Sequence, residues 1–277
     1  MPHAAADQVL ALMRVQCEAL AAHERGARRG RDPEELHQMR TAVRRLRAIL
    51  RAVPAVVGPD AAPLRRELRW LGTVLGAVRD VDVLRDYLRA ARPMLDRAEA
   101  AAARRVLARL QNARTRARAA ALAALASPRY ARLRRRLDAT LGRRGPGDGD
   151  VSLTRVARRM FKKLREAVRA LPARPSDAQL HAVRIRVKRA RYAAELARAT
   201  VGRPARRFIR SAARLQDILG EHQDAAVAEA QLRALLTKDG SGRDRLLARQ
   251  RRRRRMAWTA FRKGWPKVER RGRKAWG

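Results

Sequence analysis

The sequence predicts an all-α protein made of two related helical bundles. Apolar residues recur at three- and four-residue steps along almost the whole chain, which is typical of helices that bury one face. Apolar residues make up 46 % of the 277 residues and aromatic residues only 4 %, so the core must consist largely of Ala, Leu and Val. Ala and Leu favour helix, and runs typical of strands are scarce. The second observation behind the prediction is an internal repeat.

The segment 33–53 shows how each helix is identified. Its apolar residues follow the helical period at Leu36, Met39, Val43, Leu46 and Leu50. Asp32 and Pro33 supply an N-cap and a first-turn proline, and Pro54 ends the segment. By the same criteria we expect helices over 5–24, 33–53, 60–78, 80–91, 94–126, 128–141, 151–171, 177–199, 204–220, 222–236 and 243–263.

The sequence repeats itself across a segment rich in glycine and proline at 143–150. A single shift of 144 residues, without a gap, relates two separate pairs of segments, 36–47 with 180–191 and 71–83 with 215–227. We therefore expect one domain over 1–277, in which halves at 1–142 and 151–277 are joined by a linker at 143–150. A pseudo-two-fold axis should relate the two bundles.

The net charge of +41 indicates a polyanionic partner. There are 67 basic residues, of which 60 are arginines, against 26 acidic ones. Such an excess repels itself in a compact chain unless an anion or strong hydration offsets it. The planar guanidinium fork matches two phosphate oxygens at once, so a partner rich in phosphate is favoured.

One cationic helix occurs in both copies of the repeat. Its polar positions are His37, Arg40, Arg44 and Arg47 in the first copy, and His181, Arg184, Lys188 and Arg191 in the second. On a helix the four positions fall within a sector of about 80° and span about 15 Å. Neither 36–51 nor 178–194 contains an acidic residue that would relieve the repulsion. A solvated basic face is the plain alternative, but both copies keep the histidine.

Other basic residues are secondary candidates for the same site. Arg14 matches Arg158 at the 144-residue offset, and Arg66 matches Arg210. Further candidates without such a match are Arg69, Lys162, Arg206, Arg207 and Arg214, with Arg65 nearby. For each of these alone, a solvated surface position is at least as good an interpretation.

Several remaining features favour structural roles. Asp80 and Asp224 each follow a glycine by four residues, and we expect both to cap helices. Cys17 is expected to fill the core. The arginine-rich segment 249–255 precedes Trp258, Phe261 and Trp265. This pattern suits single-stranded nucleic acid or an anionic membrane surface, but we favour packing of the three rings on the core.

Some classes of protein and site are disfavoured. No signal peptide or membrane-spanning run is evident, so we expect a cytoplasmic protein. The five histidines and single cysteine lack metal-ligand spacing, and no activated-serine motif is present. We expect no metal, no cofactor and no catalytic residue.

The two cationic helices resemble the signature of CHAD domains, the conserved-histidine α-helical domains. The resemblance rests on Leu36-His-Gln-Met-Arg-Thr-Ala-Val-Arg-Arg-Leu-Arg47, on its second copy at 180–192, and on the segments 75–82 and 215–224. It implies two helical bundles that flank a basic groove or pore lined by the signature residues. It also implies non-enzymatic binding of inorganic polyphosphate, and targeting to polyphosphate granules. Lys188 departs from the pattern, because a point charge replaces a guanidinium fork.

Two other functions stay open at this stage. The charge ensures nonspecific nucleic-acid binding at low salt, although aromatic residues for base stacking are sparse. An enzyme acting on polyphosphate or a nucleotide would need carboxylates that hold a metal beside the cations, and the signature helices have none. The sequence is compatible with a monomer or a homodimer.

Overall fold

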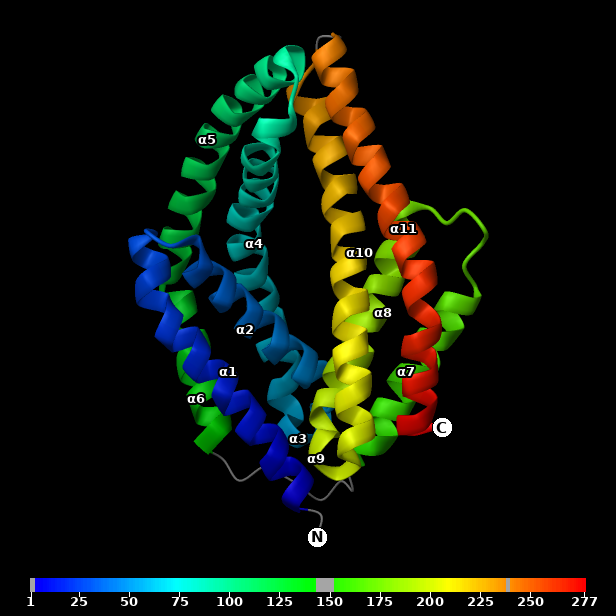
Figure 1. The fold of residues 1–277 in the computed structure, drawn as a ribbon. Coiled ribbons are helices and arrows are strands. Elements are labelled where there is room, and N and C mark those ends of the chain that lie inside the picture. The colour runs from blue at the N-terminus through cyan, green and yellow to red at the C-terminus, as the bar shows by residue number, and fades with distance from the viewer. Residues whose placement is uncertain (1–2, 143–151, 238–239) are drawn as a thin grey trace. The chain divides into compact units, whose positions relative to one another are not determined.

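The structure, a computed structural model, describes residues 3–142, 152–237 and 240–277. Within these ranges the regular elements are all helical, which confirms the predicted all-α class (Figure 1). The elements are α1 (His3–Arg29), α2 (Pro33–Ala52), α3 (Pro54–Val57), the short 3-10 helix η1 (Gly58–Asp60), α4 (Ala61–Ala91), η2 (Arg92–Met94), α5 (Arg97–Ala126), α6 (Pro128–Gly142), α7 (Leu153–Arg169), α8 (Asp177–Leu196), α9 (Arg198–Val201), α10 (Arg203–Leu235) and α11 (Ser241–Trp276).

The chain forms two compact units. Unit 1 comprises Met1–Arg79, Arg116–Arg159 and Tyr192–Val201, and unit 2 comprises Asp80–Thr115, Met160–Arg191 and Gly202–Gly277. These units differ from the predicted sequence halves, since each takes segments from both. A compact unit is defined by packing and a repeat by sequence, so the repeat stays a prediction. The predicted linker at 143–150 lies outside the described residues.

Unit 1 is organised by the packing of α1 against α2. The predicted apolar stripe of α2 is buried throughout, at Leu36, Met39, Val43, Leu46 and Leu50. The Asp32 side chain accepts a 2.8 Å hydrogen bond from the Glu34 backbone N–H, as expected of an N-cap. Burial of this stripe fixes the rotation of α2 and therefore the direction of its polar row.

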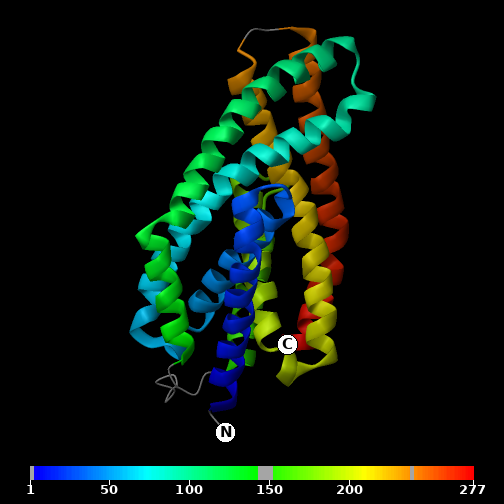
Figure 2. The same ribbon diagram turned by 90° about the vertical axis from the view of Figure 1, so that its left-hand side faces the viewer.

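Unit 2 is organised by a pair of long helices, α10 and α11, which lie side by side in both views (Figures 1 and 2). An apolar cluster joins them to α4 and α5, with Leu84, Val106, Leu232 and Leu246 among its buried members. The buried Glu99 side chain accepts a 2.6 Å hydrogen bond from Arg249 Nε. This charge pair ties α5 to α11.

Three predicted helix boundaries are wrong. The helices expected at 60–78 and 80–91 form one helix, α4, and those expected at 204–220 and 222–236 form one helix, α10. The last helix, α11, continues beyond 263 and past Pro266 to Trp276. Glycine in a helix interior costs only about 1 kcal/mol relative to alanine, so packing along the whole length outweighs it.

The predicted caps at Asp80 and Asp224 are wrong for the same reason. Both residues lie in the interior of continuous helices, where the backbone N–H groups already have helical partners. In the described part of the chain, no helix is both long enough and apolar enough to cross a membrane.

Candidate anion-binding site

The first signature helix places a row of half-buried cations in unit 1. His37, Arg40, Arg44 and Arg47 are all partly buried, beside the apolar stripe that packs α2 into the unit. Arg44 Nη2 donates a 3.2 Å hydrogen bond to Thr41 Oγ1. Within the described residues, the buried Nε atoms of Arg44 and Arg45 and the buried Nδ1 of His37 have no hydrogen-bond partner. Unsatisfied buried donors are costly, and an anion would satisfy those of the arginines.

Two glycines of α4 make room for this row. A Cβ atom placed on Gly76 would lie 2.9 Å from Nη1 of Arg40, closer than side chains normally approach. A Cβ atom on Gly72 would lie 3.4 Å from Nη1 of Arg47. The guanidinium groups of α2 therefore extend across bare backbone on α4. This explains why α4 carries glycines in a helix interior.

Arginines of α2 and α4 surround Arg47. Burial lowers the pKa of the Arg47 guanidinium, and three neighbouring guanidinium groups lower it further, those of Arg69, Arg51 and Arg65. The pKa of Arg51 is lowered by burial and by the Arg65 and Arg69 charges. Arg47 and Arg51 nevertheless stay protonated near neutral pH. Their mutual repulsion marks a place where a bound anion is strongly favoured.

A similar field acts on His37. Burial lowers the pKa of the imidazole below its ordinary value of 6.5, and the Glu34 carboxylate opposes this effect. Three guanidinium groups lower the pKa further, those of Arg79, Arg44 and Arg40. The free protein therefore disfavours a proton on His37. An anion that screens the arginines would reverse the preference.

The second signature helix presents its row in unit 2. Arg184, Lys188 and Arg191 are half-buried on α8, and His181 is exposed. Nδ1 of His181 lies 2.6 Å from Oε1 of Gln223 on α10, within hydrogen-bond distance. A Cβ atom on Gly220 of α10 would lie 3.7 Å from Nη2 of Arg184. The 144-residue offset relates this glycine–arginine pair to the Gly76–Arg40 pair of unit 1.

The residues that act on the first row differ in charge from those 144 positions further along the chain. Four arginines of unit 1 act on the first row, namely Arg51, Arg65, Arg69 and Arg79. At the equivalent positions of the second copy stand Glu195, Ile209, Ala213 and Gln223. The four arginines that act on the first row therefore have no basic counterpart at this offset.

The secondary candidates for the binding site have different surroundings in the structure. All nine are exposed: Arg14, Arg66, Arg69, Arg158, Lys162, Arg206, Arg207, Arg210 and Arg214. Arg69 joins the first row through its effect on Arg47. Arg14 instead extends towards α6, where its Nη2 lies 3.4 Å from the carbonyl oxygen of Leu141. A binding role for the others stays a prediction.

Arg51 and Arg79 were absent from the residues predicted from sequence. Arg51 continues the row one turn beyond Arg47, a spacing that could have indicated it. Arg79 acts on His37 from a different helix, so no local pattern could have found it. Across the described ranges, no group of three or more His, Cys, Asp or Glu side chains is placed to hold a metal ion.

Comparison with known proteins identifies similar sequences and structures. A family model of the CHAD domain matches residues 11–233. An uncharacterized protein found in two strains of Mycobacterium tuberculosis is 33 % identical over 248 residues, which is 83 % of this chain and 46 % of that protein. The chain thus spans about half the length of these relatives.

Two solved structures are also similar. The crystal structure of the CHAD domain from the plant Ricinus communis has a TM-score of 0.76 and 33 % identity, covering 94 % of this chain and 90 % of that one. PptA from Streptomyces chartreusis has a TM-score of 0.78 and 24 % identity, covering 94 % and 99 %. The second likeness shows the fold alone.

Proposed function

The chain belongs to the CHAD domain family, and on this premise we propose that it binds inorganic polyphosphate without converting it. The observation that carries the proposal is the first signature row, where half-buried arginines lie among other guanidinium groups and the buried Nε donor of Arg44 is unsatisfied. A phosphate chain supplies both missing elements, negative charge and hydrogen-bond acceptors.

A linear polyanion suits a row better than a compact ligand does. The row from His37 to Arg47 extends about 15 Å along the helix axis, so several successive phosphates can contact it. Arg51 and Arg65 extend the row by another turn and onto α4. Partial burial reduces the screening of each contact by water and salt.

Binding without turnover follows from the chemistry of the two rows. Phosphoryl transfer relies on carboxylates that position a metal ion beside the cations. Neither 36–51 nor 178–194 contains an acidic side chain. Phosphate release during prolonged incubation with Mg²⁺ would contradict this part of the proposal.

The finer elements of the proposal rest on the repeat and on the family resemblance. They are a basic groove shared by both signature helices, a cytoplasmic location and association with polyphosphate granules. The additional arginines that act on the first row, Arg51, Arg65, Arg69 and Arg79, support a larger contribution of the first signature helix to the affinity. A fluorescent fusion of the full chain in cells that accumulate polyphosphate tests the location directly.

A competition titration tests the central claim. Labelled long-chain polyphosphate is titrated with the protein at two salt concentrations, with duplex DNA as competitor. We expect Arg40→Gln with Arg44→Gln to weaken binding by at least about 10-fold, since each residue makes charge-assisted bonds. The matched control, Arg104→Gln with Arg105→Gln, removes the same charge from exposed positions of α5 and should change the Kd much less.

Nonspecific nucleic-acid binding is the alternative function. The large positive charge supports it at low salt. Displacement of polyphosphate by excess duplex DNA at physiological salt would favour it. Equal losses in the two double variants would likewise show that only the overall charge matters.

A further inference from the structure

Three of the ten aromatic residues of the chain gather on one stripe of α11. Trp258 and Phe261 stack with ring centroids 5.5 Å apart and planes inclined by 16°, and Phe261 and Trp265 stack at 6.5 Å and 20°. Phe261 is buried, whereas both tryptophans are half-buried. The core therefore accounts for Phe261, as predicted, but leaves part of each indole accessible. A polyphosphate chain has no planar or apolar group that would pack against these rings.

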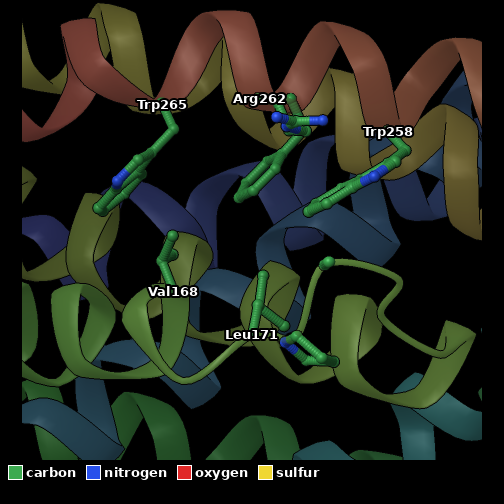
Figure 3. Close-up of a pocket in the computed structure, with 8 residues that line it drawn as sticks. Val168, Leu171, Trp258, Arg262 and Trp265 are labelled. Carbon is green, nitrogen blue, oxygen red and sulfur yellow. The ribbon is translucent and has the colours of Figure 1, made fainter.

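These rings form one wall of a cavity of about 340 Å³ in unit 2. Figure 3 shows the Trp258 and Trp265 side chains extending from α11 towards Val168 of α7 and Leu171 of the loop that follows it, with Arg262 between them along α11. The wall opposite the rings is apolar and includes Pro172 and Ala173. Arg262 is the charged member of the lining.

A second cavity, of about 280 Å³, adjoins the first and shares Trp258 with it. Four arginines line it, namely Arg174, Arg251, Arg254 and Arg255, together with one carboxylate, Asp177. Phe261 stacks on one face of the Trp258 indole, and the same indole lines both cavities.

Two of these arginines are held in place by acidic partners. Arg254 pairs with Asp177 and lies 3.3 Å from Glu229, and Arg251 Nε donates a 3.1 Å hydrogen bond to Glu229. Arg174 and Arg255 are exposed. The cavity thus combines fixed cations with exposed ones, and its charge stays positive in spite of Asp177.

We propose that the two adjoining cavities form a nucleotide site, separate from the signature rows. The ligand class is a nucleobase linked to phosphate, supplied by a free nucleotide or by the end of a single-stranded nucleic acid. The base packs against the Trp258 indole, and the phosphates contact Arg255 and Arg174. Base stacking on an aromatic ring beside cations is a general way to hold nucleotides without reading their sequence.

The experiment compares ATP with inorganic tripolyphosphate, which has similar charge but no base. Isothermal titration uses the full chain with Arg40→Gln and Arg44→Gln, so that binding at the first signature row is weakened. It should show ATP bound about 10-fold more tightly, the typical gain from one stacked base. Trp258→Leu should abolish this preference. Trp70→Leu is the matched control, because Trp70 is a half-buried tryptophan of unit 1 covered by Arg129, 4.3 Å from its ring.

Two substitutions at exposed positions test the proposal even if Trp258→Leu does not fold. Arg255→Gln should weaken ATP binding several-fold, whereas Arg252→Gln, an exposed neighbour outside the cavity lining, should not. A short oligoadenylate compared with ATP distinguishes the two sources of the ligand. Equal affinity of the Arg40→Gln, Arg44→Gln chain for ATP and tripolyphosphate, or equal effects of the two arginine variants, would overturn the proposal.

Discussion

Gly76 of α4 lies directly against the guanidinium group of Arg40, since a Cβ atom on this glycine would be only 2.9 Å from Nη1. A helix was expected to end at 78, just after this glycine, but α4 continues and the guanidinium group of Arg40 lies against the glycine backbone. The equivalent contact in the second copy is looser, at 3.7 Å between a Cβ on Gly220 and Nη2 of Arg184. The two glycines therefore tolerate a methyl group differently.

We expect Gly76→Ala to weaken polyphosphate binding and Gly220→Ala to leave it nearly unchanged. The methyl group on residue 76 must displace the end of the flexible Arg40 side chain, whereas at 220 it meets an ordinary contact distance. Both changes should preserve or raise stability, by up to about 1 kcal/mol, because alanine favours helix over glycine. Thermal unfolding and a binding titration on both variants measure the two effects. Equal affinities would show that Arg40 need not lie over α4.

Removing Arg51 and Arg65 should have opposite effects on binding and on stability. The two side chains repel Arg47 and each other in the free protein. Arg51→Gln with Arg65→Gln should therefore raise the unfolding temperature without ligand and weaken polyphosphate binding. The pair Arg104→Gln with Arg105→Gln again serves as control for total charge. If affinity stays at the wild-type value, the site ends at Arg47.

The local features of the fold could be read from the sequence, and the tertiary ones could not. The stripe from Leu36 to Leu50 and the Asp32 cap depend on near neighbours in the chain, and both are confirmed. The continuity of α4 through Gly76 depends on the side chains of α2 that pack against this glycine. Helix propensity describes single residues and does not include such tertiary contacts.

In the candidate site, too, the local features could be predicted from the sequence and the tertiary contacts could not. The spacing of His37, Arg40, Arg44 and Arg47 predicted one partly buried row on α2, and the structure has it. Arg79 acts on His37 from α4, a helix far along the chain, so only the fold brings them together. Likewise, the 144-residue offset predicts which positions are equivalent but not that their surroundings differ in charge.

The pH dependence of polyphosphate binding should show whether His37 takes up a proton when the ligand binds. Its pKa lies below 6.5 in the free protein because of burial and the Arg79, Arg44 and Arg40 charges, despite Glu34. A bound polyanion raises this pKa, so binding takes up a proton and tightens as pH falls through the ordinary value. His37→Gln should remove that part of the pH dependence. An unchanged pH profile in the variant, measured with the same polyphosphate, would contradict the assignment.

Without ligand, the same histidine should make stability depend on pH in the opposite sense. A lowered pKa in the folded state means that the unfolded chain binds the proton more readily, so this contribution falls as pH drops below about 6.5. His37→Gln should reduce the loss of stability between pH 7 and pH 5. Chemical denaturation at several pH values measures it, with and without polyphosphate.

Glu229 should be a main determinant of the stability of unit 2. This buried carboxylate on α10 lies 2.6 Å from Arg233, 3.1 Å from Arg251 and 3.3 Å from Arg254. Burial raises its pKa, but the arginine partners outweigh burial and hold the pKa below its ordinary value of 4.5. Glu229→Gln keeps the shape and removes the charge, which leaves these guanidinium groups without their shared counter-ion. We expect a loss of about 2–4 kcal/mol in the free energy of unfolding.

The control for Glu229 is Glu221→Gln on the same helix. Glu221 pairs with Arg253 at 2.7 Å, but 64 % of its side chain is exposed, so its loss should cost no more than about 1 kcal/mol. The Glu229 contribution is present above the ordinary pKa of 4.5 and is lost as pH falls through the lowered folded value. Urea denaturation of both variants at pH 7 and pH 3 separates the two carboxylates. Similar losses for the two at pH 7 would mean that burial of Glu229 does not strengthen its ion pairs.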